Sequence, residues 1–277
     1  ANNLVTPTFQ MGAITLTSAA AAPSDGVGGN LSSADYDHLL GNQTTVATAI
    51  SEVGVFRLSA TPVASYFGET VSGGTSGLVG RFIPAYLGAT GSASLTPSCG
   101  SAFSYQGQPM NFASGREPTL TITGYNRGGN ATTNYDRGNF WRLSTPAVGS
   151  YSSVTGTSDL DVRLASQGTA SVVVEGAGDG DGTRGYRWSD EQLLYNPALL
   201  PGGADYPFIA RIQQSFAAAA LTDPDGACHG NGVTCQDYAY DFTDDPGSEV
   251  RLGRLRIGNA HGSELQSLSL PVILESW

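Results

Sequence analysis

Carboxylates gather in three short polar segments of this 277-residue chain, and they are the first residues whose spacing could serve a chemical purpose. The segments are GDGDGT at 178–183, TDPDG at 222–226 and QDYAYDFTDD at 236–245. Calcium takes about six to eight oxygen ligands, which such loops can supply. The EF-hand pattern fails, because Thr183 and Arg184 stand where a third acid and a glycine belong. Aspartate and glycine are also ordinary turn residues, so no cofactor is expected by default and calcium is kept as an alternative.

The three cysteines predict one local disulfide. Cys228 and Cys235 flank the polar, glycine-bearing loop in ACHGNGVTC, and a disulfide between them would close it. Such a bond implies an oxidising compartment. Cys99 is then left as a buried thiol, as a partner of one of the other two, or as a partner of a residue outside the chain. Zinc would need a further ligand such as His229, and the spacing matches none of the usual zinc patterns.

The residue types argue against catalysis. All 13 basic residues are arginine, which excludes a Schiff-base lysine. There are three histidines and no Gly-x-Ser-x-Gly motif, so nothing marks a serine triad. A pair of glycosidase carboxylates would leave no local pattern, because such acids come from distant strands. We expect no enzymatic activity.

Charge and hydropathy exclude two further classes of partner. The net charge is −11 and the arginines are scattered, so a nucleic acid would be repelled. The chain contains no apolar run of about 18 residues, so we expect no membrane insertion.

The elements that must position these residues are expected to be strands. Apolar residues make up 40% of the chain and charged residues 13%, and the 37 glycines divide it into short β-type runs. NFWRLS at 139–144 is predicted as a strand with Trp141 in the core, and RIQQSFAAAAL at 211–221 is also assigned to strand. Single helical turns are expected in SADYDHLLG at 33–41 and SDEQLLYNP at 189–197.

The predicted architecture is all-β, with tandem immunoglobulin-like β-sandwiches. The polar break SGGTSG at 72–77 favours a first sandwich over residues 1–78 and a larger one over 79–264. Residues 265–277 contain alternating apolar positions and are predicted as a strand that leads into, or complements, a further domain.

Three further segments resemble a known family. GRFIP at 80–84, YQGQP at 105–109 and GRLRIGNAHGSEL at 253–265 resemble the large uncharacterised C-terminal-side domain of MshQ-like proteins, which accompany the MSHA-type type IV pilus. The resemblance implies a secreted or cell-surface protein of a Gram-negative bacterium, acting as an adhesin or tip component. The implied partners are pilus components, copies of the chain itself, and a host or surface glycan.

The stretch 176–207 departs from the family pattern, and it is where we expect a ligand-binding loop. Tyr186 and Trp188 lie in it, so they are the candidate ligand contacts. Two other functions stay open. One is a structural spacer or filament subunit that assembles through β-strand exchange, which the last strand favours. The other is a calcium-dependent glycan-binding module.

Overall fold

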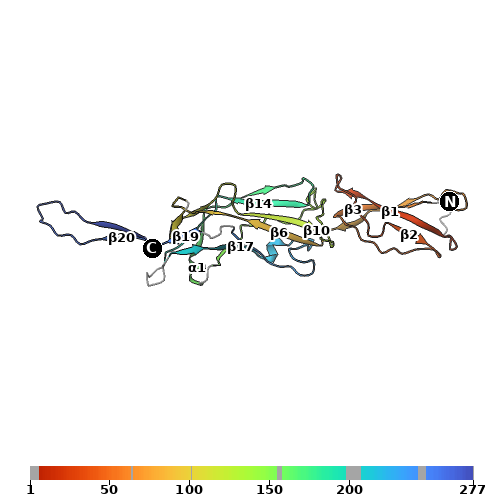
Figure 1. Cartoon of the computed structure of the whole chain (residues 1–277). Helices are drawn as coiled ribbons and strands as arrows, with labels where there is room; N and C mark the ends of the chain where they lie inside the picture. Colours follow the sequence, from red (N-terminus) through yellow and green to blue (C-terminus); the bar gives the residue numbers. More distant parts are fainter. Residues whose placement is uncertain are drawn as a thin grey trace.

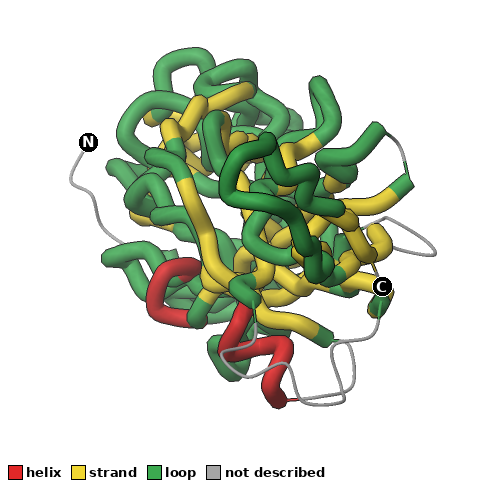
Figure 2. Tube along the Cα trace, turned by 90° about the vertical axis from the view of Figure 1, so that its left-hand side faces the viewer, coloured by secondary structure: helices red, strands yellow, loops and turns green. Residues whose placement is uncertain are grey.

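The computed structural model describes residues 6–63, 65–100, 102–154, 158–197, 207–242 and 248–276. These residues form an almost entirely β structure, which confirms the predicted fold class. Figure 1 shows three parts in a row: an N-terminal sheet at one end, a larger body, and a two-stranded ribbon at the other end. Viewed from the end in Figure 2, helix is confined to short segments among strands and loops. No helix of the described residues has the length and apolar character needed to cross a membrane.

The N-terminal sheet is antiparallel and has the order β2-β1-β3-β4, with β5 also pairing with β3. Its strands are β1 (Met11–Ala22), β2 (Asp35–His38), β3 (Gly54–Pro62), β4 (Gly74–Thr75) and β5 (Val79–Phe82). The segment predicted as a helical turn at 33–41 is β2, because pairing with β1 satisfies its backbone groups. The break expected at 72–77 contains β4, and β5 carries the same sheet on past residue 78.

The body consists of small sheets that enclose two hydrophobic clusters. One sheet has the order β13-β14-β10-β6 and faces another of order β11-β17-β18 across the first cluster. The strands of these two sheets are β6 (Tyr86–Ser92), β10 (Thr119–Tyr125), β13 (Ser171–Glu175), β14 (Thr183–Ser189), β11 (Ser150–Ser153), β17 (Ile212–Phe216) and β18 (Tyr238–Asp241). Leu87, Leu120 and Ile122 are fully buried between them.

The second cluster lies among two further sheets, of order β12-β15-β9-β7 and β16-β19-β8. Their strands are β7 (Leu95–Thr96), β8 (Phe103–Tyr105), β9 (Met110–Phe112), β12 (Leu164–Gln167), β15 (Gln192–Tyr195), β16 (Phe208–Ala210) and β19 (Ser248–Arg251). Helix α1 (Ser158–Arg163) contributes Leu160 to this cluster. The helical turn expected at 189–197 is instead β15, whose Leu193 is fully buried.

Two other segments differ from expectation in instructive ways. Residues 139–144 form no strand, yet Phe140, Trp141 and Leu143 are all buried, so a loop supplies the core contacts that were assigned to a strand. The segment 211–221 divides into β17 and the 3-10 helix η1 (Ala218–Leu221), because the alternating residues up to Phe216 pair with β11 or β18 and the alanines that follow pair with neither strand.

The ribbon β20 (Gly253–Ile257) and β21 (Val272–Ser276) projects from the body. The last strand thus folds back onto the GRLRI segment, with Leu255 opposite Leu274 and Ile257 opposite Val272.

Candidate functional site at the junction of the sheet and the body

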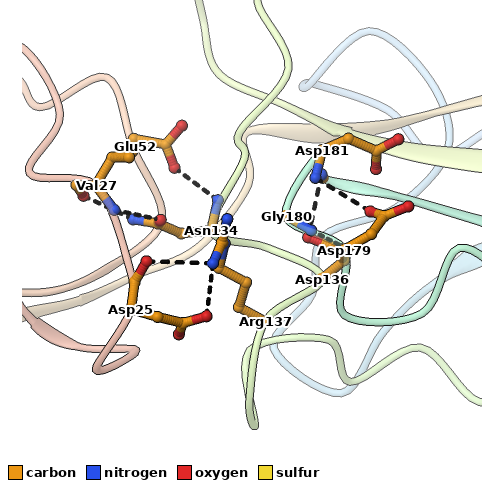
Figure 3. Close-up of polar contacts among 10 residues, drawn as sticks. Asp25, Val27, Glu52, Asn134, Asp136, Arg137, Asp179, Gly180 and Asp181 are labelled. Atoms are coloured by element: carbon orange, nitrogen blue, oxygen red, sulfur yellow. Dashed lines mark hydrogen bonds and ion pairs between the residues drawn. The ribbon is translucent and has the colours of Figure 1, made fainter.

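The segment 132–137 of the body joins the N-terminal sheet to the aspartate-rich loop at 179–181 (Figure 3). On the N-terminal side, Asn134 is completely buried and its carboxamide bonds only to backbone groups. Its Oδ1 accepts from the N–H of Val27 at 2.8 Å, and its Nδ2 donates to the carbonyls of Val27 and Val53, both at 2.9 Å. The oxygen and the nitrogen of the carboxamide both have hydrogen-bond partners, so this buried polar side chain stabilises the junction.

Glu52 provides the second buried link. Its carboxylate is almost buried and accepts from the N–H of Thr133 at 2.8 Å and from the N–H of Asn134 at 3.0 Å. Backbone donors of this kind are what a buried carboxylate requires. Arg137 adds an ion pair with Asp25 at the surface, where the Asp25 side chain is 64% exposed and solvent screens the attraction.

The other side of the same segment forms a cluster of three carboxylates. Asp136 is completely buried and accepts from the N–H groups of Gly180 at 3.0 Å and Gly182 at 3.1 Å. The side chains of Asp179 and Asp181 are exposed, and carboxylate oxygens of the three residues lie within 4.8 Å of one another. Desolvation and repulsion by Asp181 and Asp136 raise the pKa of Asp179.

Glycine is required in this loop for two reasons. Gly182 has a φ of +80°, and a Cβ there would stand 2.3 Å from the carbonyl oxygen of Thr132. Gly180 has a φ of +85°, which also favours glycine, and a Cβ there would lie 1.8 Å from Nη2 of Arg137. The guanidinium therefore packs directly on the loop and supplies positive charge beside the carboxylates. The cluster could contribute ligands to a calcium ion, but Arg137 and the backbone donors already offset part of its charge.

The remaining aspartates of the polar segments act in turns and caps. Asp223 accepts from the N–H of Asp225 at 2.9 Å, from the N–H of Ala227 at 3.0 Å and from the hydroxyl of Tyr135 at 2.9 Å. Burial and the neighbouring Asp223 carboxylate raise the pKa of Tyr135, which therefore stays protonated. The carboxylate of Asp237 accepts from the N–H of Ala218, the first residue of η1, at 2.7 Å.

Asp225 and Asp241 also have structural partners. Asp225 pairs with Arg81 at 2.7 Å and with Arg142 at 3.0 Å, while Asp241 accepts from Gln213. Asp244 and Asp245 lie outside the described residues.

Tyr186 and Trp188 are part of the core, which corrects their assignment as ligand contacts. They are 2% and 1% exposed, and the ring of Trp188 stacks on Phe216 at 5.4 Å between centroids. The physical reason is the position of β14 between β13 and β10, which turns alternate residues of the strand towards the opposing sheet. In the sequence these two aromatic residues alternate with Arg187, and this alternation indicates that both side chains lie on the same face of a strand.

The cysteines adopt one of the arrangements left open by the sequence. A disulfide joins Cys228 and Cys235. Cys99 is a half-buried thiol whose Sγ donates to Oε1 of Gln108 at 3.4 Å.

Comparison with known proteins identifies one family. A model described as DUF6701, third domain, matches residues 52–244, from the junction carboxylate Glu52 through most of the body. No curated protein and no solved structure matches the chain.

Proposed function

This chain belongs to the DUF6701 family, and from that premise we propose that it is a non-enzymatic cell-surface protein of a Gram-negative bacterium. Its proposed role is that of an adhesin or tip component of an MSHA-like type IV pilus. The observation that carries the proposal is the serial arrangement of sheet, body and ribbon, held by a buried polar junction. An adhesive module that works at a distance from the cell needs such an extended and internally braced form.

The chemistry of the described residues supports this reading. The disulfide between Cys228 and Cys235 suits an oxidising compartment outside the cytoplasm. Two histidines are engaged in local contacts: Nδ1 of His38 lies 2.6 Å from the hydroxyl of Thr44, and Nδ1 of His229 lies 3.0 Å from the carbonyl of Gln236. The carbonyl at His229 is not a nucleophile, and only the Thr44 hydroxyl at His38 belongs to a nucleophilic type.

Two measurements test the proposal. Antibodies against the chain should label intact cells, and the chain should co-purify with pili sheared from them. The purified chain should bind saturably to a defined glycan on an array. Absence of the chain from intact surfaces and from sheared pili, together with a blank array, would overturn the adhesin proposal.

A second candidate, a filament subunit, is favoured by the uneven faces of the ribbon. One face carries Leu255, Ile257, Val272 and Leu274, which are between 60% and 70% exposed. The opposite face is polar at Glu275, which pairs with Arg254 at 2.6 Å and Arg256 at 3.6 Å. A two-stranded hairpin alone is marginally stable in water, so an apolar cover from a second copy of the chain would stabilise it.

Oligomeric state decides between the candidates. Leu274→Asp places a charge on the apolar face, whereas Ile273→Asp places the same charge on the polar face one residue away. The filament candidate predicts concentration-dependent assembly in light scattering that only Leu274→Asp abolishes. A wild-type chain that stays monomeric at all concentrations would eliminate it.

A further inference from the structure

A pocket lies where the N-terminal sheet meets the body. It encloses about 520 Å³ and is lined by three parts of the chain: residues 48–52 before β3, residues 82–85 at the end of β5, and Asn126, Arg127 and Thr132 of the body. A second pocket of about 280 Å³ shares Arg127 and the 49–51 segment. Both volumes are of the order of known ligand sites, which are often found at domain boundaries.

The wall formed by residues 82–84 is apolar and accessible. Phe82 is 36% exposed and Ile83 is 40% exposed, and Pro84 and Ile50 extend the same surface. The ring of Phe82 is held in place by Phe56, at 5.8 Å between centroids. An exposed aromatic ring in the lining of a pocket is suited to packing against the C–H face of a sugar.

The body side of the lining carries an exposed positive charge. Arg127 is exposed, and within the described ranges no carboxylate contacts its guanidinium. Glu52 is the other charged residue of the lining, but its carboxylate is already bonded to the N–H groups of Thr133 and Asn134. The net charge of −11 repels anions at long range, yet at physiological salt this repulsion is screened beyond about 8 Å.

The backbone around Arg127 is fixed rather than free. The side chain of Asn126 accepts from the N–H groups of Gly128 at 2.9 Å and Asn130 at 3.1 Å, and it donates to the carbonyl of Ser51 at 3.0 Å across the junction. These bonds fix the backbone on either side of Arg127 before any ligand arrives, so less backbone entropy is lost on binding.

We propose that this junction pocket binds a sugar that bears a carboxylate, with Arg127 pairing with the carboxylate and Phe82 packing against the ring. A guanidinium forms two parallel hydrogen bonds with a carboxylate, which makes arginine selective for this group. The inference rests on the proposed adhesive function and names its ligand class. The sugar is the terminal residue of a surface glycan, and a free sugar acid is the alternative source of the same chemistry.

The test uses the intact chain and two sugars that differ in one group, methyl glucuronide and methyl glucoside. We expect calorimetry to show the glucuronide binding at least about 10-fold more tightly, which corresponds to one charge-assisted contact. Arg127→Gln should remove that difference. Arg116→Gln, which neutralises an exposed arginine on another loop, should preserve it. Phe82→Ala should weaken both sugars, with its melting temperature measured to confirm folding.

The outcomes separate this inference from the adhesive function. Binding of neutral glycans alone, or glucuronide binding that Arg127→Gln leaves unchanged, overturns the pocket assignment while adhesion stands. An array that is blank for every sugar, with no glucuronide binding in calorimetry, overturns the pocket assignment. The adhesin proposal is overturned as well only if the chain is also absent from intact cells and from sheared pili. Array binding to acidic glycans without measurable affinity for the free glucuronide supports a glycan terminus as the source.

Discussion

The carboxamide of Asn134 forms a reciprocal pair of hydrogen bonds with the backbone of Val27, accepting from its N–H at 2.8 Å and donating to its carbonyl at 2.9 Å. The two residues are 107 positions apart in the chain. This side chain bonds to both backbone groups of Val27, as a residue of a neighbouring strand would, and so joins the N-terminal sheet to the body.

Asn134→Ala should weaken this junction. It leaves the buried carbonyl of Val53 without this partner, and an unsatisfied buried group costs about 1–3 kcal/mol. It also removes the two part-buried hydrogen bonds to Val27. We expect a loss of about 2–4 kcal/mol in the free energy of unfolding, measured by denaturant titration. Small-angle scattering should also show a wider range of angles between sheet and body. Asn130→Ala, at an exposed position, is the control; an equal effect of both variants would contradict the role given to Asn134.

Removing the disulfide should destabilise the body moderately. Cys228 and Cys235 are seven positions apart, and closing so short a loop contributes about 2–3 kcal/mol in the chain-entropy model. We expect the Cys228→Ser, Cys235→Ser double variant to melt several degrees lower than the wild type. Reductant should lower the melting temperature of the wild type but not that of this double variant. Cys99→Ser should respond to reductant as the wild type does, since Cys99 is a thiol.

The Asp179 carboxyl should make the pH dependence of stability distinctive. Its pKa is raised in the folded state, so the folded chain binds this proton more tightly than the unfolded chain does. The free energy of unfolding therefore falls as the pH rises from the ordinary pKa of an aspartate through the raised pKa. We expect Asp179→Asn to raise the melting temperature at pH 7 in EDTA and to flatten this decline. Asp35→Asn, on an edge strand, should do neither.

The Asp179→Asn variant also tests whether the aspartate cluster binds calcium. In the calcium-dependent glycan-binding hypothesis the ion would sit among Asp136, Asp179 and Asp181. That hypothesis predicts a wild-type melting temperature that calcium raises and EDTA lowers, and it predicts that Asp179→Asn is destabilising in calcium buffer. An identical melting curve in both buffers would eliminate it.

Trp188→Ala should destabilise the body rather than impair a ligand site. The side chain is 1% exposed and stacks on Phe216, and truncating a buried tryptophan costs about 3–5 kcal/mol. We expect a large drop in the midpoint of urea unfolding. The conservative Trp188→Phe variant should retain glycan binding at temperatures where it stays folded; selective loss of binding by this folded variant would restore Trp188 as a contact.

Much of the secondary structure was predictable because the signal is local. Alternating apolar residues, short runs and frequent glycines indicate strands. The predictions failed at 33–41 and 189–197, where a few residues with helical capping patterns pair with distant strands instead. A strand has no hydrogen bonds of its own, so its existence depends on a partner that local propensity does not reveal.

The sequence by itself determined the all-β class, the absence of lysine chemistry and the short loop closed by Cys228 and Cys235, because each depends on composition or on neighbouring residues. Only the tertiary structure decided that Tyr186 and Trp188 face the core, that Glu52 meets Asn134 across 82 positions, and that Phe82 and Arg127 line one pocket. These relationships arise from the packing of one sheet against another. Burial and proximity in such packing follow from contacts between segments far apart in the chain, and no local pattern encodes them.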